Sequence, residues 1–99
     1  MAVETATTTA TTVTGVTVTV EVRAFAAARA ALGWSQQQAT LGAGASVADA
    51  LAWIAAEAPD AAPVLTRCAV LLDGRRVTEA TAVVPDGARL DLLPPFAGG

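Results

Sequence analysis

The chain lacks lysine, histidine and tyrosine, and it has a single cysteine among its 99 residues. Chemistry that requires a lysine or histidine side chain of this chain is therefore excluded. The absence of lysine has two interpretations, which are a codon bias and the protection of a reactive acyl group from nearby amines. With Cys68 alone, neither an intramolecular disulfide nor a cysteine metal site can form, and we expect a reducing cytoplasm as the location.

Basic charge is also scarce, since the six arginines are outnumbered by nine acidic residues and the net charge is −3. Nucleic acid is therefore not an expected partner, because its binding depends on basic side chains that neutralise phosphates. No apolar run reaches the roughly 18 residues of a membrane span, and no signal peptide or membrane partner is expected. The length suits one domain, whose core must come from side chains larger than the abundant alanine.

Three segments differ in composition and divide the chain. Residues 1–15 are rich in threonine and alanine and predict a flexible extension. Residues 16–93 contain the periodic apolar patterns of a folded domain. Residues 94–99 form a short tail that ends in Gly-Gly.

The first half of the domain changes its period twice. Residues 16–24 alternate between apolar and polar side chains, which predicts a half-buried strand. Phe25, Ala28, Arg29 and Leu32 then follow the spacing of a short helix that Gly33 ends. Within residues 36–43, the stretch 38–41 is interpreted as an edge strand paired with the first strand.

Ser46 begins the clearest helix, with Asp49 at the position of a capping-box acid and Pro59 at its end. Residues 68–72 are a short apolar run before Asp73-Gly74, a strong hairpin signal, so residues 75–78 should return as a strand. Residues 85–87 indicate another turn, and residues 89–93 the last strand. This order predicts an α+β fold, the β-grasp, with four to five strands, one main covering helix, and the first and last strands parallel at the centre.

The tail Pro94-Pro95-Phe96-Ala97-Gly98-Gly99 follows the last strand directly. Proline cannot donate to a β-ladder, so the strand stops and the tail projects in an extended form. Glycine has no Cβ and can enter a narrow channel, where nothing shields the terminal carboxylate from attack. Phe96 is the only large apolar side chain of the tail. It is interpreted as an anchor for a partner pocket, or alternatively as a cover over the end of the sheet.

Three stretches of the chain resemble a known family. They are residues 22–29, residues 62–65 (Ala62-Pro63-Val64-Leu65) and residues 92–99, which include the tail. They look like the small subunit of molybdopterin synthase, a member of the MoaD/ThiS family of ubiquitin-like sulfur carriers. The resemblance covers residues 16–99, and the tail is its most specific part.

This resemblance implies a function for the tail. An E1-like adenylyltransferase would activate Gly99 with ATP, and a sulfurtransferase would convert the adenylate to a thiocarboxylate. The tail would then enter the large catalytic subunit of molybdopterin synthase and donate sulfur to cyclic pyranopterin monophosphate. Gly99 is the reactive residue, Gly98 its flexible neighbour, and Pro94, Pro95, Phe96 and Ala97 contact the partner. The chain would hold no permanent cofactor, and the catalytic groups would belong to its partners.

Two other functions remain open. The chain could be a sulfur carrier for thiazole, cysteine or natural-product synthesis, with the same tail chemistry and a different acceptor. It could also be a ubiquitin-like modifier that forms isopeptide bonds with lysines of target proteins. The Pro-Pro-Phe-Ala spacer favours the first function.

Other residues have less specific patterns. Cys68 is interpreted as structural rather than as a redox thiol or sulfur relay, because its strand position suggests burial. Arg75 and Arg76 suit a solvated turn better than a docking site, and Trp53 suits packing against a loop better than ligand contact. No metal site is expected, because the spacing of the aspartates at 73, 86 and 91 matches no known motif.

Overall fold

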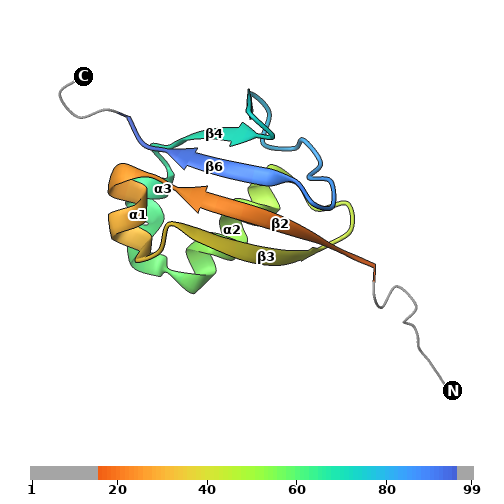
Figure 1. The fold of residues 1–99 in the computed structure, drawn as a ribbon, viewed down its shortest axis with the longest axis horizontal. Coiled ribbons are helices and arrows are strands. Elements are labelled where there is room, and N and C mark those ends of the chain that lie inside the picture. Colours follow the sequence, from red (N-terminus) through yellow and green to blue (C-terminus); the bar gives the residue numbers. More distant parts are fainter. Residues whose placement is uncertain (1–15, 96–99) are drawn as a thin grey trace, which may run out of the picture.

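The computed structural model describes residues 16–95, and these form one mixed sheet with helices packed against it (Figure 1). The elements in chain order are β2 (Thr17–Ala24), α1 (Ala26–Leu32), β3 (Gln36–Gly42), α2 (Val47–Glu57), the 3-10 turn η1 (Pro59–Ala61), α3 (Ala62–Leu65), β4 (Ala69–Leu72), β5 (Arg75–Arg76) and β6 (Arg89–Leu93).

The sheet has the strand order β3-β2-β6-β4-β5, with β2 and β6 parallel at its centre. The other neighbours are antiparallel, so β2 and β3 form one hairpin-like pair and β4 and β5 another. Helix α2 lies behind the sheet in Figure 1. The described residues therefore adopt the predicted α+β β-grasp, and the first and last of its strands meet as expected.

The alternating pattern of β2 places one set of side chains in the core. Val18, Val20, Val22 and Ala24 are all buried, and the polar residues between them face the other side of the sheet. Val16 shares their parity but lies just outside the strand and is half exposed. The core is completed by Leu90 and Leu92 from β6 and by Ile54 from α2, all three fully buried.

Helix α2 begins where the capping box predicts. The Asp49 backbone N–H donates to Ser46 Oγ at 3.1 Å, and the Ser46 N–H donates to the Asp49 carboxylate at 2.9 Å. These two bonds satisfy backbone groups that have no partner inside the helix. Val47, Ala50 and Ile54 then form its buried stripe.

Helix α1 ends at Gly33, as its sequence predicts. The Gly33 N–H donates to the Arg29 carbonyl at 2.8 Å, and its φ of 87° is left-handed. Only glycine adopts this conformation without strain from a Cβ atom.

Two parts of the fold differ from the sequence-based expectation. The helical turns η1 and α3 were not expected, because Pro59 was taken only as the end of the preceding helix. Pro59 and Pro63 instead occupy the first turns of η1 and α3, where the missing N–H of proline needs no partner. The return strand after Gly74 is also shorter than expected, since β5 has two residues rather than the four of positions 75–78.

Within residues 16–95, every helix is too short or too polar to cross a membrane.

Candidate tail and its supporting strand

The predicted tail is attached to the central strand β6. Leu90 and Leu92 of this strand are fully buried, and the Leu92 carbonyl accepts the Phe25 N–H at 3.2 Å. Leu93 is the last residue paired in the sheet, opposite Ala69. Pro94 and Pro95 follow without regular structure, the first half-buried and the second exposed. The backbone is therefore held firmly up to Leu93, immediately before the two prolines.

Of the six predicted tail residues, the structure describes only these two prolines. Phe96, Ala97, Gly98 and Gly99 lie outside the described residues. Their roles, including both interpretations of Phe96, remain predictions.

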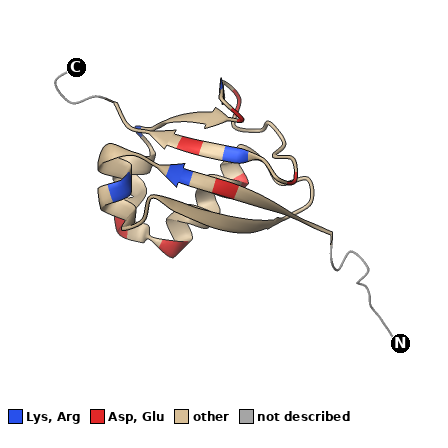
Figure 2. Cartoon of the chain, viewed as in Figure 1, with Lys and Arg blue, Asp and Glu red and all other residues tan. Residues whose placement is uncertain are grey.

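Charged side chains alternate along the two central strands, on the face opposite α2. Figure 2 shows acidic and basic positions alternating on β2 and β6. The parallel register places Glu21 opposite Arg89 and Arg23 opposite Asp91. Opposite charges in direct register stabilise a pair of strands and disfavour a shifted register.

Asp91 is the centre of this charged group and the one buried charged residue within positions 16–95. Arg23 Nε donates to its carboxylate at 3.0 Å, and Arg89 Nε lies 3.7 Å from the same oxygen. The hydrogen bond with Asp91 raises the pKa of Arg23 above its usual value. This pairing ties β2 to β6 three residues before the tail begins at Pro94. No local sequence pattern indicates this ion pair, because Arg23 and Asp91 are 68 positions apart.

Asp73 and Asp86 each accept a hydrogen bond from a backbone N–H group. Asp73 Oδ1 accepts the Arg89 N–H at 2.9 Å, and Asp86 Oδ1 accepts the Thr19 N–H at 2.8 Å. No cluster of three or more potential metal-binding side chains occurs in the part of the chain that the structure describes.

Cys68 lies just before β4 and is half-buried. Its Sγ atom is 3.4 Å from the Val64 carbonyl oxygen, to which the thiol donates. Burial raises the pKa of this thiol, so less of the nucleophilic thiolate forms near neutral pH. These observations support a structural role and argue against a sulfur relay.

The structure also places Trp53 and the two hairpin arginines. Trp53 is half-buried and packs against the core cluster. Arg75 and Arg76 are exposed on β5, where no ion pair with another described residue forms.

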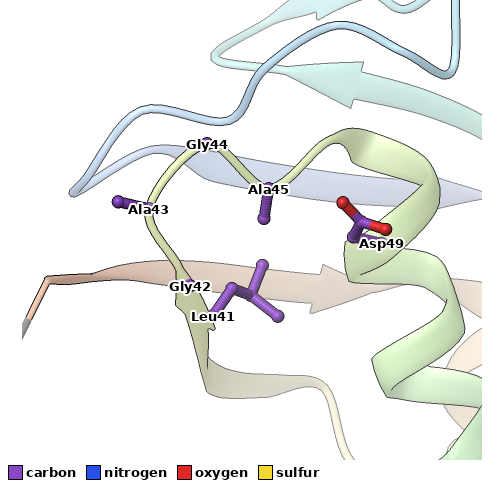
Figure 3. A pocket seen from close by; sticks show the side chains of 6 residues that line it. All are labelled: Leu41, Gly42, Ala43, Gly44, Ala45 and Asp49. Atoms are coloured by element: carbon purple, nitrogen blue, oxygen red, sulfur yellow. The ribbon is translucent and has the colours of Figure 1, made fainter. Parts of the chain in front are cut away.

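A shallow hollow of about 320 Å³ lies where β3 turns into α2 (Figure 3). Its lining is Leu41, Gly42, Ala43, Gly44, Ala45 and Asp49. Asp49 is the only charged side chain there, and it already accepts the Ser46 N–H. One oxygen of the only charged side chain in the hollow is therefore used to cap α2.

The fold and its parallel central strands define a ubiquitin-like β-grasp protein. A model of the ThiS family matches residues 22–99, most of the domain and the whole tail, so the chain belongs to the ThiS family.

Solved structures show the same fold. The HVO 2177 protein of Haloferax volcanii is 30% identical, with a TM-score of 0.74, over 85% of this chain and 89% of that one. A chain in the complex of subunits 1 and 2 of the molybdopterin-converting factor from Helicobacter pylori is 26% identical, with a TM-score of 0.59, over 83% of this chain and 100% of that one. Small archaeal modifier protein 1 of Methanosarcina acetivorans is 22% identical, with a TM-score of 0.72, over 86% and 100%. None of the curated proteins compared with the chain matches it.

Proposed function

We propose that this protein is a sulfur carrier that supplies sulfur for molybdopterin synthesis as the small subunit of molybdopterin synthase. The main supporting observation is that the central strand β6 leads without a break into the Pro-Pro segment of the tail. The family match extends through residue 99 and so includes Gly98 and Gly99. The similarity to the Helicobacter pylori complex favours a large catalytic subunit as the partner.

The chemistry takes place at one carboxylate. An oxygen of the Gly99 carboxylate attacks the α-phosphorus of ATP on an E1-like adenylyltransferase, and pyrophosphate leaves. A thiol reductant releases sulfide from the persulfide of a sulfurtransferase, the sulfide attacks the acyl carbon, AMP leaves, and a thiocarboxylate forms. When this sulfur passes to the pterin acceptor, water supplies the oxygen that restores the carboxylate. The chain has neither histidine nor lysine, so its partners supply the acid, base and phosphate-binding groups.

The folded domain holds the tail in a position from which it can dock to a partner. The anchored strand β6 fixes the starting point, and Pro94 and Pro95 restrict the backbone that follows, which lowers the entropy lost on docking. Phe96 then occupies a pocket of the partner, and Gly98-Gly99 passes through a channel too narrow for larger residues.

The test is the intact mass of the purified chain after incubation with ATP, a sulfur source and its activating enzymes. Conversion should add the mass difference between one sulfur and one oxygen atom. A variant that lacks Gly99, and another with one residue added after it, should gain no sulfur while keeping the native tryptophan fluorescence. Absence of sulfur on the unmodified chain, with enzymes that are active on another carrier, would contradict the proposal.

The same test separates the carrier from a protein modifier. A modifier would transfer its Gly99 acyl group to the ε-amine of a target lysine, and such conjugates would appear in cells as branched peptides. Because this chain has no lysine, copies of it cannot be joined to one another through lysine side chains. Conjugates without any thiocarboxylate would favour the modifier function.

Sulfur transfer to a different acceptor would retain the carrier chemistry and change only the pathway. Purified thiocarboxylated chain, mixed with the large synthase subunit and its pterin substrate, should yield the dithiolene product. Transfer only to a thiazole or cysteine precursor would instead assign the carrier to another pathway.

A further inference from the structure

The two edges of the sheet are very different. The edge strand β5 has two residues, and both are arginines, which are exposed. Short length and charge are two ways in which proteins prevent edge strands from pairing with other chains. The opposite edge strand, β3, has seven residues, Gln36–Gly42, with no charge and no proline. It pairs with β2 in unbroken register, so it also lacks a protective bulge.

The outer side of β3 has backbone groups without a partner among residues 16–95. The pairs at either end of the ladder form inward hydrogen bonds, since the Ala24 N–H donates to the Ser35 carbonyl and the Ala43 N–H donates to the Val16 carbonyl. Because hydrogen-bonded and non-hydrogen-bonded pairs alternate in an antiparallel ladder, Gln37, Ala39 and Leu41 bond inward to β2. The even-numbered residues between them direct their backbone groups outward.

Gln38 and Thr40 are the centre of this outward set. Their side chains are exposed on the open face, and no other described strand pairs with β3 on that side. The outward Gly42 carbonyl is already used, since it accepts the Ala45 N–H at 3.1 Å. A row of exposed, uncharged backbone donors and acceptors is a template for one more strand.

We propose that the β3 edge pairs with the β3 edge of a second copy of this chain. Antiparallel pairing about a two-fold axis at Ala39 places Gln38 of each copy opposite Thr40 of the other, so their outward backbone groups meet as hydrogen-bonded pairs. Since β3 is uncharged, no like charges face each other on these strands. The same register keeps both open faces on one side and both sets of helices on the other.

This arrangement leaves the tails free. A two-fold axis perpendicular to the sheet reverses the direction of every strand in the second copy. The two β6 strands, separated from the interface by β2 and β3 of each copy, therefore point their carboxyl ends in opposite directions. The pairing is consistent with the carrier function but does not depend on it.

Amide hydrogen exchange of the full chain, measured by NMR at several concentrations, tests the proposal. Exchange of the Gln38 and Thr40 N–H groups should slow as the concentration rises. The Ala39 N–H, which already donates to β2, is the internal control and should not change. Fast exchange of Gln38 and Thr40 at every concentration would overturn the proposal. Slow exchange that does not depend on concentration would also overturn it, because another part of the chain would then cover the edge.

A charge pair tests the register. With Gln38→Lys and Thr40→Lys together, like charges would face each other across the interface twice. With Gln38→Lys and Thr40→Glu, opposite charges would face each other. Sedimentation should show association at least roughly tenfold weaker in the first double variant than in the second. Equal association would overturn the register and the proposal.

A third variant, Thr40→Pro, removes an outward N–H. Proline is tolerated at such an edge position, so the fold should survive while the dimer is lost. A dimer that persists in this variant, with native tryptophan fluorescence, would also contradict pairing through β3.

Discussion

Leu92 and Leu93 are adjacent on β6 and differ sharply in environment. Leu92 is fully buried under the helices, whereas Leu93 is half-buried on the opposite face, at the last paired position before the tail. Successive strand residues face opposite sides of a sheet, so the two alanine variants change the same chemical group in two different surroundings. Each is therefore the control for the other.

The burial of each leucine sets the size of the expected effect. Truncation of a fully buried leucine to alanine destabilises a protein by about 2–5 kcal/mol, because transfer energy is lost and a cavity remains. We expect about 3 kcal/mol for Leu92→Ala, a large share of the roughly 5–15 kcal/mol that stabilises a small domain. For Leu93→Ala we expect about 1 kcal/mol or less, since part of the Leu93 surface is already in water and no closed cavity forms.

Urea unfolding followed by tryptophan fluorescence measures both values. Trp34 and Trp53 are partly buried against the core, so their emission reports on its packing. The midpoint should fall strongly for Leu92→Ala with the slope of the transition unchanged. By thermal unfolding, the same variant should lose roughly 12–24 °C in Tm, at about 4–8 °C per kcal/mol for a domain of this size.

The comparison of the two variants can refute the structure of this strand. Equal losses, or a larger loss for Leu93→Ala, would mean that β6 is shifted by one residue and that Leu93 is the buried side chain. The tail would then leave the sheet from the opposite face, and the proposed way in which β6 positions the tail for its partner would be wrong.

Three further predictions concern single positions. Gly33→Ala should destabilise the fold by about 1 kcal/mol in the same urea assay, because alanine is strained at a φ of 87°. The added Cβ would have no atom within 4 Å, so backbone strain is the only cost. A stabilised variant would contradict the left-handed cap. Burial raises the pKa of Cys68, so the rate of its alkylation should rise at a higher pH in the folded chain than in the chain unfolded by urea. The stability linked to this thiol should be lost as pH rises through its pKa in the folded chain. Coincident alkylation profiles of the folded and unfolded chains would show that the thiol is not buried. Phe96→Ala should weaken binding to the large subunit in calorimetry with little change in Tm, whereas a large fall in Tm would support the alternative that Phe96 covers the sheet.

The elements with strict periodicity were predictable from the sequence. The valine alternation gave β2, the Ser46–Asp49 spacing gave the start of α2, and Asp73-Gly74 gave the hairpin turn, whose two residues both have positive φ. In each case the signal lies within a few neighbouring residues, so it is readable without knowledge of the tertiary contacts.

The remaining features depend on contacts between distant parts of the chain. The role of Asp91 requires Arg23 on another strand, and the roles of Asp73 and Asp86 require backbone N–H groups 16 and 67 positions away. The turns η1 and α3 are each about one turn long, too short for helical periodicity to be visible. The sequence also does not show where β5 ends. The strand stops at Arg76, although the next residue, Val77, still donates its N–H to the Val70 carbonyl at 2.8 Å.

The parallel pairing of β2 with β6 also has a mechanical consequence. The chain enters the sheet at Thr17 and leaves it at Leu93, at opposite ends of the two neighbouring central strands. A force that pulls these points apart acts along both strands and shears all the hydrogen bonds between them together. Peeling an edge strand would instead break such bonds one after another. Because forced unfolding depends on the unfolding rate, the domain should resist tension on its carboxyl-terminal end far better than its modest size suggests.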